Sequence, residues 1–208
     1  YKSLFDTLKF DDKSLENLWQ VHEFQGHIIY RSFSELIVIA GNTAAHISSQ
    51  EAFLNSGVIR NKYYVQEAGQ GILQFDPQKL VQRLIFNEDQ FGKEEIKAFL
   101  PTQVEEEILL VAKSGNIYKG NTATAEIEPW VDVFGKNHLD QVISAIPFNN
   151  NYLLGTLSSK IVLLTQEGEL DFNPPSFRNV SNSSVLNLYR DGNNIWSLLN
   201  NGLDCIEV

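Results

Sequence analysis

Short apolar runs separated by polar turns form the hydrophobic pattern of this chain. Helical periodicity is scarce, and its best candidates, residues 78–85 and 92–100, are short. The apolar runs are strand-length, often contain β-branched or aromatic residues, and end at Gly, Asn, Ser or Asp. They are HIIYRSF, ELIVIA, KYYVQEA, GILQF, EILLVAKS, NYLLGTLS, KIVLLT and NIWSLLN. Runs of this kind are typical of β-strands, so the sequence predicts an all-β fold.

A strand–turn–strand unit recurs five times along the chain. The units start at residues 27, 62, 107, 151 and 194, so their spacings are 35, 45, 44 and 43 residues. The predicted turns are Phe33-Ser34, Gly69-Gln70, Ser114-Gly115, Ser158-Ser159 and Asn201-Gly202. A period of roughly 40–45 residues with this content is typical of the blades of a β-propeller.

Each unit has flanking runs that complete a four-stranded blade, with strands a to d from the inside outward. We expect one propeller domain, or part of one, with about five blades near residues 17–50, 51–86, 95–131, 139–175 and 184–208. The last blade contains only strands a to c. The segment YKSLF has no earlier a–b–c partner, so residues 1–8 are expected to supply the missing d strand and remove two exposed edges.

The end of the chain resembles the two-component regulator propeller repeat family. The segment SSVLNLYRDGNNIWSLLNNGLDCIEV has an opening Val-x-x-Leu, an Asp-Gly turn before a Trp, and a closing Asn-Gly-Leu. LLGTLSSKIVLLTQEGEL resembles the blade before it, and LENLWQVHEFQGHIIYRSFSELIVI a further blade. The resemblance covers most of residues 15–208 and is loose in the second and third blades.

The resemblance implies an architecture and a role. Propellers of this family have about seven blades, so five blades imply part of a larger ring. In the family the propeller is the extracytoplasmic sensor of a bacterial transmembrane regulator with a kinase or DNA-binding output. Its ligands are often breakdown products of carbohydrates, and the signal passes through a dimer. The resemblance therefore implies a periplasmic sensor domain that is not itself an enzyme.

Charge narrows the classes of partner. Sixteen basic and 26 acidic residues give a formal net charge of −10. Nucleic-acid and anionic-membrane surfaces need basic patches, so we expect neither partner for this chain. No apolar stretch approaches the ~20 residues of a membrane-spanning helix. The chain also has no Met and no signal-peptide pattern, so we expect it to be a piece of a longer protein that carries any membrane segment.

Candidate metal ligands are weak. The sequence Asp191–Asn194 has calcium-like Asp-x-Asn spacing, but no further acidic ligands or distal Glu follow, so it predicts a tight turn. His22 and His27 lie five residues apart in a predicted hairpin, whereas zinc proteases place two His four apart on a helix. His46 and His138 are the other histidines. We predict no metal and no cofactor.

Candidate catalytic residues are equally weak. Glu105–Glu107 could supply paired carboxylates, but adjacent residues of a strand point to opposite faces. The chain has no G-x-S-x-G motif, and Cys205, its single cysteine, has no His nearby in the sequence. We therefore expect a domain without catalytic residues.

The large residues of the hairpins are expected to form the core between blades. Trp196 follows the turn at Asp191–Asn194 and is expected to be buried at a position comparable to those of Tyr30, Leu110 and Leu154. Trp19 lies on a predicted inner strand, so it is the tryptophan most expected to line the central channel.

Ligand binding is expected from the b–c turns, which lie on one face of a propeller. The turn residues with hydrogen-bonding groups are Arg31, Ser34, Gln70, Ser159 and Asn201. Arg31 is the one formal cation among them, so it is the candidate for an anionic sugar or a carboxylate. The function hypothesis is sensing of a small polar ligand, such as an oligosaccharide. Two alternatives stay open: a glycan-active enzyme with acids on separate blades, and a structural or protein-interaction propeller.

Overall fold

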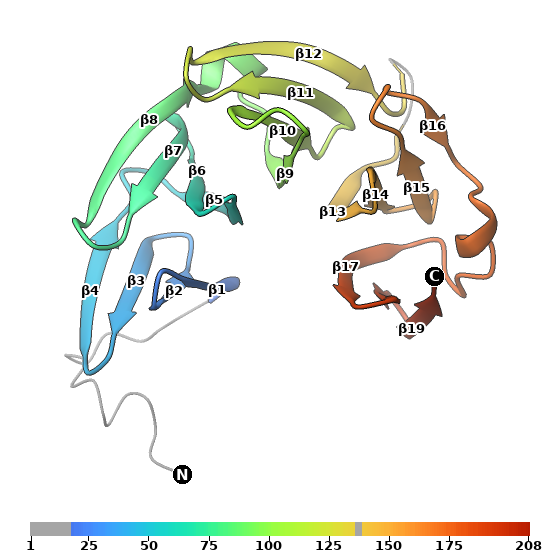
Figure 1. Ribbon diagram of the computed structural model, residues 1–208, viewed down its shortest axis with the longest axis horizontal. Helices are drawn as coiled ribbons and strands as arrows, with labels where there is room; N and C mark the ends of the chain where they lie inside the picture. The colour runs from blue at the N-terminus through green and yellow to red at the C-terminus, as the bar shows by residue number, and fades with distance from the viewer. Residues whose placement is uncertain (1–17, 136–138) are drawn as a thin grey trace. The chain divides into compact units, whose positions relative to one another are not determined.

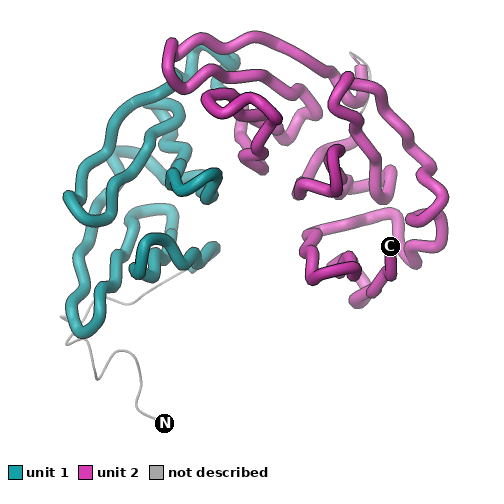
Figure 2. Tube along the Cα trace, viewed as in Figure 1, with its two compact units in different colours: residues 1–93 teal, residues 94–208 magenta. Residues whose placement is uncertain are grey.

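Residues 18–135 and 139–208 are described by a computed structural model of the chain. Apart from two short 3-10 helices, every regular element of these residues is a β-strand, which confirms the all-β prediction. The chain divides into two compact units, which we call unit 1 (residues 1–93) and unit 2 (residues 94–208) (Figure 2). Within the described residues no helix is long and apolar enough to cross a membrane.

Unit 1 contains two antiparallel sheets, each built from four consecutive strands (Figure 1). The first sheet consists of β1 (Gln20–Phe24), β2 (His27–Arg31), β3 (Glu35–Ala40) and β4 (Thr43–Ser48). The second consists of β5 (Phe53–Ile59), β6 (Lys62–Glu67), β7 (Gly71–Asp76) and β8 (Val81–Asn87), and is followed by the helix η1 (Glu88–Phe91).

Unit 2 contains three further antiparallel sheets of consecutive strands. The third sheet consists of β9 (Ile96–Pro101), β10 (Glu107–Ala112), β11 (Asn116–Asn121) and β12 (Glu126–Asp132). The fourth consists of β13 (Val142–Phe148), β14 (Asn151–Thr156), β15 (Ile161–Leu164) and β16 (Leu170–Asp171). The helix η2 (Pro175–Phe177) precedes the fifth, which consists of β17 (Val185–Asp191), β18 (Asn194–Leu199) and β19 (Gly202–Glu207).

The predicted hairpins are present in all five sheets. Each predicted b–c turn joins two paired strands, as at Gly115, whose φ of +97° suits the turn between β10 and β11. Asp191–Asn194 joins β17 to β18 as a turn, with φ of +59° at Gly192. The two helical candidates, residues 78–85 and 92–100, instead contain the starts of β8 and β9. In β9, Ile96, Ala98 and Leu100 are buried, whereas the apolar residues at the start of β8 are largely exposed.

The hydrophobic core lies between successive sheets of each unit. In unit 1, Phe24, Ile29 and Leu36 from the first sheet pack with Tyr63 and Phe75 from the second. Since side chains alternate along a strand, one sheet can supply two cores. The fourth sheet does so in unit 2.

Leu153 and Leu154 show how the fourth sheet serves two cores. They are adjacent on β14 and both fully buried. Leu154 belongs to the cluster with the third sheet, and Leu153 to the cluster with the fifth. The two faces of one strand therefore hold three sheets of unit 2 together.

The burial prediction holds for Leu110 and Leu154 but is wrong for Tyr30 and Trp196, which are only partly buried. Trp196 lies on the face of β18 opposite Ile195, which packs into the core. Its cross-strand neighbour on that outer face, Tyr189, is 66% exposed.

Five sheets match the predicted number of blades, and four of them have the predicted four strands. In the described residues the fifth sheet has three. The expected completion by residues 1–8 falls on residues outside the described part of the chain, and the larger ring stays a prediction.

Candidate functional site

Arg31, the predicted ligand-binding cation, lies inside unit 1. It ends β2 and is 4% exposed. Its Nε donates to Gln20 Oε1 at 2.7 Å, and its Nη1 donates to the backbone carbonyl of Phe53 at 2.7 Å. Arg31 therefore joins β1, β2 and β5 rather than standing on an exposed turn, and a direct contact with ligand stays a prediction.

The other four predicted residues lie at turns. Ser34 and Asn201 are exposed, and Gln70 and Ser159 are partly exposed. The Ser34 hydroxyl lies 3.3 Å from that of Ser32, and the Ser159 hydroxyl donates to Asp140 Oδ2 at 2.5 Å. Arg31, Ser34 and Gln70 belong to unit 1, and Ser159 and Asn201 to unit 2, so neither unit brings all five together.

In unit 2, two predicted b–c turns, Ser114-Gly115 and Ser158-Ser159, are each held by a carboxylate from the connection that precedes their sheet. Glu94 accepts hydrogen bonds from the hydroxyl of Ser114 and from Asn116 Nδ2, the latter at 2.7 Å. Asp140 accepts one from the backbone N–H of Ser158 at 2.8 Å. Sequence reasoning missed these contacts because the partners lie about twenty residues apart, and nothing in a turn motif identifies a distant acceptor.

A polar network holds β1 against β5. Gln20 Oε1 accepts from Arg31 and also from the backbone N–H and hydroxyl of Ser56, at 2.8 and 3.0 Å. Gln20 Nε2 donates to Asn55 Oδ1 at 2.7 Å. Because Arg31, Asn55 and Ser56 are buried, a polar group of theirs that lost its partner here would be costly.

His22 lies beside this network, with its Nε2 3.2 Å from Ser56 Oγ and its ring edge-on to that of Tyr63. Burial and the positive charge of Arg31 lower the pKa of His22. Burial likewise raises the pKa of Tyr63 to about 12. His22 is thus held neutral at pH 7 and serves as a packing and hydrogen-bonding residue.

Within the described ranges, no group of three or more His, Cys, Asp or Glu side chains is placed to hold a metal ion. His27 Nδ1 lies 2.9 Å from the carbonyl of Gln25, and His46 Nδ1 lies 2.7 Å from Glu35 Oε2. His138 falls outside the described residues. Within the acidic run, Glu106 accepts a hydrogen bond from Thr122 Oγ1 at 2.7 Å.

Two exposed aromatic rings lie together at the b–c turn of the first sheet. Trp19, just before β1, is 56% exposed, and Phe33, in the turn between β2 and β3, is 46% exposed. Their ring centroids lie 5.3 Å apart at an interplanar angle of 54°. We call Leu18, Trp19, Phe33 and Ser34 the Trp19–Phe33 surface. Single exposed apolar residues are ordinary, but a contiguous exposed group marks a candidate binding surface.

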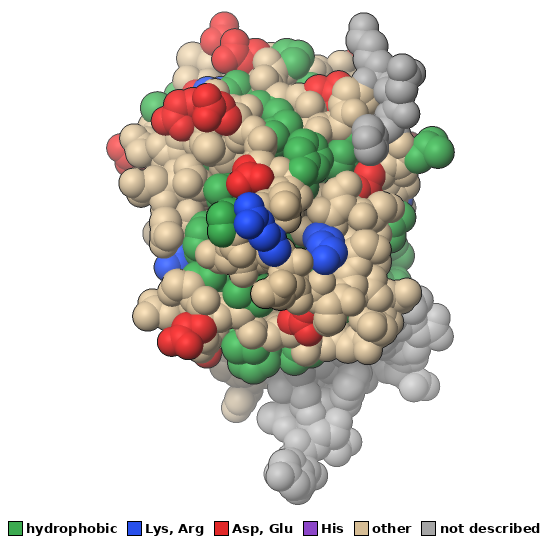
Figure 3. Space-filling view, turned by 90° about the vertical axis from the view of Figure 1, so that its right-hand side faces the viewer, with side chains coloured by type: hydrophobic (Ala, Val, Ile, Leu, Met, Phe, Trp, Pro, Cys, Tyr) green, Lys and Arg blue, Asp and Glu red, His purple; other side chains and the backbone are tan. Residues whose placement is uncertain are grey.

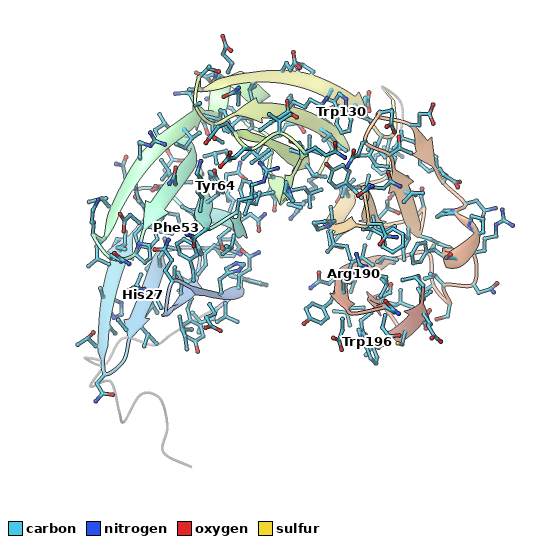
Figure 4. The ribbon with its side chains drawn as sticks, viewed as in Figure 1. His27, Phe53, Tyr64, Trp130, Arg190 and Trp196 are labelled. Carbon is cyan, nitrogen blue, oxygen red and sulfur yellow. The ribbon has the colours of Figure 1, made fainter. Side chains whose placement is uncertain are left out.

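The backbone under the Trp19–Phe33 surface is fixed by hydrogen bonds. The N–H of Trp19 donates to the carbonyl of Arg31 at 2.9 Å. The carbonyl of Phe33 accepts from the N–H of Phe53 at 2.8 Å and from Ser49 Oγ at 3.2 Å. Phe53, labelled in Figure 4, is the first residue of β5. The rings therefore stand on backbone that is hydrogen-bonded to neighbouring strands, although Trp19 precedes β1 and Phe33 lies in a turn.

The Trp19–Phe33 surface suits an uncharged ligand with an apolar face. Its rings offer flat apolar area, and the exposed hydroxyl of Ser34 offers a neutral donor and acceptor. The guanidinium carbon of Arg31 lies 6.0 Å from the Phe33 ring centroid, and Arg31 is buried. The sequence pattern indicated Trp19 as the tryptophan most expected to line the channel. It gave no binding role to Phe33, because an aromatic residue in a turn carries no periodic signal.

Acidic side chains dominate the charged surface, as the net charge requires. On the face drawn in Figure 3, acidic groups are spread over several places and basic groups gather near the middle. A face with this mixture lacks the broad basic patch that nucleic acids need.

Comparisons with known proteins establish the fold. No family model matches the sequence, and a search of curated proteins finds no match. Among solved structures, the extracellular domain of the one-component system BT4673 from B. thetaiotaomicron matches with a TM-score of 0.68 and 12% identity over 95% of this chain and 28% of that one. The WD40 β-propeller domain of Doa1 matches with a TM-score of 0.64 and 12% identity over 92% and 63%.

A third match is PorZ, a bacterial surface component of the type-IX secretion system of Porphyromonas gingivalis. Its TM-score is 0.62, with 15% identity over 92% of this chain and 27% of that one. The chain spans less than two thirds of the length of each of these three structures. At such identities the likeness shows the fold alone, so the chain has a β-propeller fold and the specific repeat family stays a prediction.

Proposed function

We propose that this chain is a ligand-sensing propeller domain of a bacterial signalling protein, placed outside the cytoplasm. Its fold resembles an extracellular domain of a one-component system, which supports this proposal at the level of architecture. The proposed ligand is a small neutral oligosaccharide, such as a breakdown product of a larger carbohydrate. In this role the signal is the occupancy of the site and not the turnover of a substrate.

The observation that carries the proposal is the Trp19–Phe33 surface. A sugar ring has an apolar C–H face and hydroxyls around its edge, so it can stack on an aromatic ring while bonding to neutral polar groups. Two rings at 54° to each other offer a shaped wall, and Ser34 lies beside them. Because backbone hydrogen bonds tie Trp19 and Phe33 to neighbouring strands, binding a ligand requires little further ordering of this backbone.

Calorimetry of the chain against a panel of neutral oligosaccharides tests the proposal. We expect saturable binding, and we expect Trp19→Ala to weaken it roughly tenfold or more, as truncation of a central aromatic contact does. Tyr189→Ala is the matched control, because Tyr189 is also an exposed aromatic but belongs to unit 2.

Chromatography of the same mixtures separates sensing from catalysis. Under the proposal the oligosaccharides are recovered unchanged after long incubation. Release of shorter sugars would replace the sensing role with that of a glycan-active enzyme. Absence of binding across the panel, or equal binding by wild type and Trp19→Ala, would remove this surface as the sensor site.

A further inference from the structure

A small cavity in unit 2 is separate from the surface proposed above. It lies where the third and fourth sheets meet and has a volume of about 190 Å³. Gln103 Nε2 donates to Gln166 Oε1 at 2.6 Å and so links the two sheets at its edge. Sites for drug-sized ligands measure roughly 300–1,000 Å³, so this cavity suits a smaller molecule.

Lys119 on β11 is the cation of this cavity. It is partly buried, and its Nζ lies 4.5 Å from the centre of the Trp130 ring. In the part of the chain that the structure describes, Lys119 forms no ion pair. A partly desolvated ammonium gains most from a carboxylate, because attraction between charges strengthens as water is excluded.

Glu107 on β10 lines the same cavity. Leu109 pairs with Lys119 and Glu107 pairs with Asn121, so Glu107 and Lys119 are diagonal neighbours on one face of the sheet. The backbones of diagonal neighbours lie roughly 7–8 Å apart, within reach of long side chains, so the charged ends of Glu107 and Lys119 can both reach one small group in the cavity. An opposite pair of charges at one cavity fits a ligand that itself carries both an ammonium and a carboxylate.

The surrounding charges set the orientation of such a ligand. Glu107 and Lys119 also line an adjoining hollow of about 540 Å³, together with Glu126 and Glu128. Glu128 is the direct cross-strand neighbour of Lys119, and these further carboxylates favour an ammonium in the adjoining hollow. Lys119 is the one cation among the described residues that line the cavity and the hollow, so it is the group that can hold the ligand carboxylate, and the ammonium is directed to Glu107 and the adjoining hollow.

The rest of the wall has a polar part, formed by Thr102, Gln103 and Gln166, and an apolar part. Leu109 and Tyr152 are buried, and Trp130 lies in β12, two residues before its end (Figure 4). The Tyr152 hydroxyl donates to the carbonyl of Pro101 at 2.9 Å, so its polar end is satisfied. Val104 completes this wall. An aliphatic side chain would bury its surface here.

We propose that this cavity binds a free α-amino acid with an aliphatic side chain, with its carboxylate on Lys119 and its ammonium at Glu107. The site is independent of the oligosaccharide proposal, since it lies in unit 2 and shares no residue with the Trp19–Phe33 surface.

Calorimetry with three matched ligands tests the proposal on the unaltered chain. L-leucine carries both charges, L-leucinamide lacks the carboxylate, and 4-methylpentanoate lacks the ammonium. We expect L-leucine to bind at least tenfold more tightly than either of the other two. Equal binding of all three, or no binding of leucine, isoleucine or valine, would overturn the proposal.

Substitutions assign the two charges to residues. Lys119→Met and Glu107→Gln keep side-chain size, and each is expected to weaken L-leucine binding at least tenfold. Lys79→Met, at an exposed lysine of unit 1, is the control and leaves the affinity unchanged. L-leucine affinity unaltered by Lys119→Met would contradict the assignment. Circular dichroism shows whether each variant is folded, and the ligand comparison remains decisive if one is not.

Discussion

At the residue scale, Arg31 shows how a side chain can look functional in the sequence and be structural in the fold. It was the only cation at a predicted ligand-binding turn, but its guanidinium is buried and bonded to Gln20 and to the carbonyl of Phe53. Sequence spacing identified the turn correctly. It could not show that β5 closes over the arginine, because that contact depends on how two sheets pack.

Substitution of Arg31 is expected to cost stability. Arg31→Met removes one of the three donors to Gln20 Oε1 and the side-chain donor to the Phe53 carbonyl, and bonds to charged groups contribute about 1.5–3 kcal/mol each. We expect the free energy of unfolding to fall by about 3 kcal/mol in urea denaturation. Arg83→Met is the matched control, because Arg83 is exposed and its bond to Gln74 is solvated. Equal losses for the two variants would contradict a structural role for Arg31.

His22 predicts a pH dependence of stability. Its pKa is lowered in the folded state, first by burial and then by Arg31, so below about pH 6.5 the unfolded chain takes up the proton more readily. Stability therefore falls as the pH drops below about 6.5 and is regained above it. Denaturation midpoints between pH 5 and 7.5 should show this slope, and His22→Gln should reduce it. If the slope persists in His22→Gln but vanishes in His27→Gln, the pH dependence comes from His27 and the prediction for His22 is wrong.

At the element scale, the hairpins were the most predictable part of the fold. Turn residues and β-branched runs act locally, so the strand–turn–strand units appear in the sequence as they do in the structure. Residues 92–100 were more ambiguous, because GKEEIKAFL has helical propensity. It becomes the start of β9 because Ile96, Ala98 and Leu100 must enter a sheet core. Tertiary packing determines whether such a segment becomes a helix or a strand, and a single sequence does not show that packing.

Two glycines at the ends of strands should differ sharply in how well the fold tolerates their substitution by alanine. Gly71 begins β7 with φ of +126°, and a Cβ there would lie 2.1 Å from the carbonyl oxygen of Phe86. Gly192, in the turn between β17 and β18, has nothing within 4 Å of a Cβ. We expect Gly71→Ala to destabilise the fold by about 3 kcal/mol or more, and Gly192→Ala by about 1 kcal/mol. Thermal unfolding of the two variants makes the comparison, and a reversed order would show that backbone strain at Gly71 is relieved.

At the scale of the whole molecule, the propeller fold followed from the period of the repeat, whereas the candidate sites did not. The Trp19–Phe33 surface joins a residue before β1 to one in the turn between β2 and β3. The cavity at Lys119 needs two sheets to meet. Both depend on packing between elements, so a motif read along the chain could name Trp19 and Ser34 but could not show which residues lie beside them.

The net charge of −10 predicts how ionic strength affects any bound saccharide. Long-range repulsion opposes anionic ligands, and it extends about 30 Å at 0.01 M salt but only about 8 Å at 0.15 M. A neutral oligosaccharide should therefore bind with nearly the same affinity at both salt concentrations. A carboxylated derivative of the same length should bind more weakly at 0.01 M and recover part of the difference at 0.15 M. Calorimetry at the two salt concentrations measures this. Tighter binding of the carboxylated form at low salt would show that a local cation outweighs the field of the whole protein, and Arg31 would then return as a candidate contact.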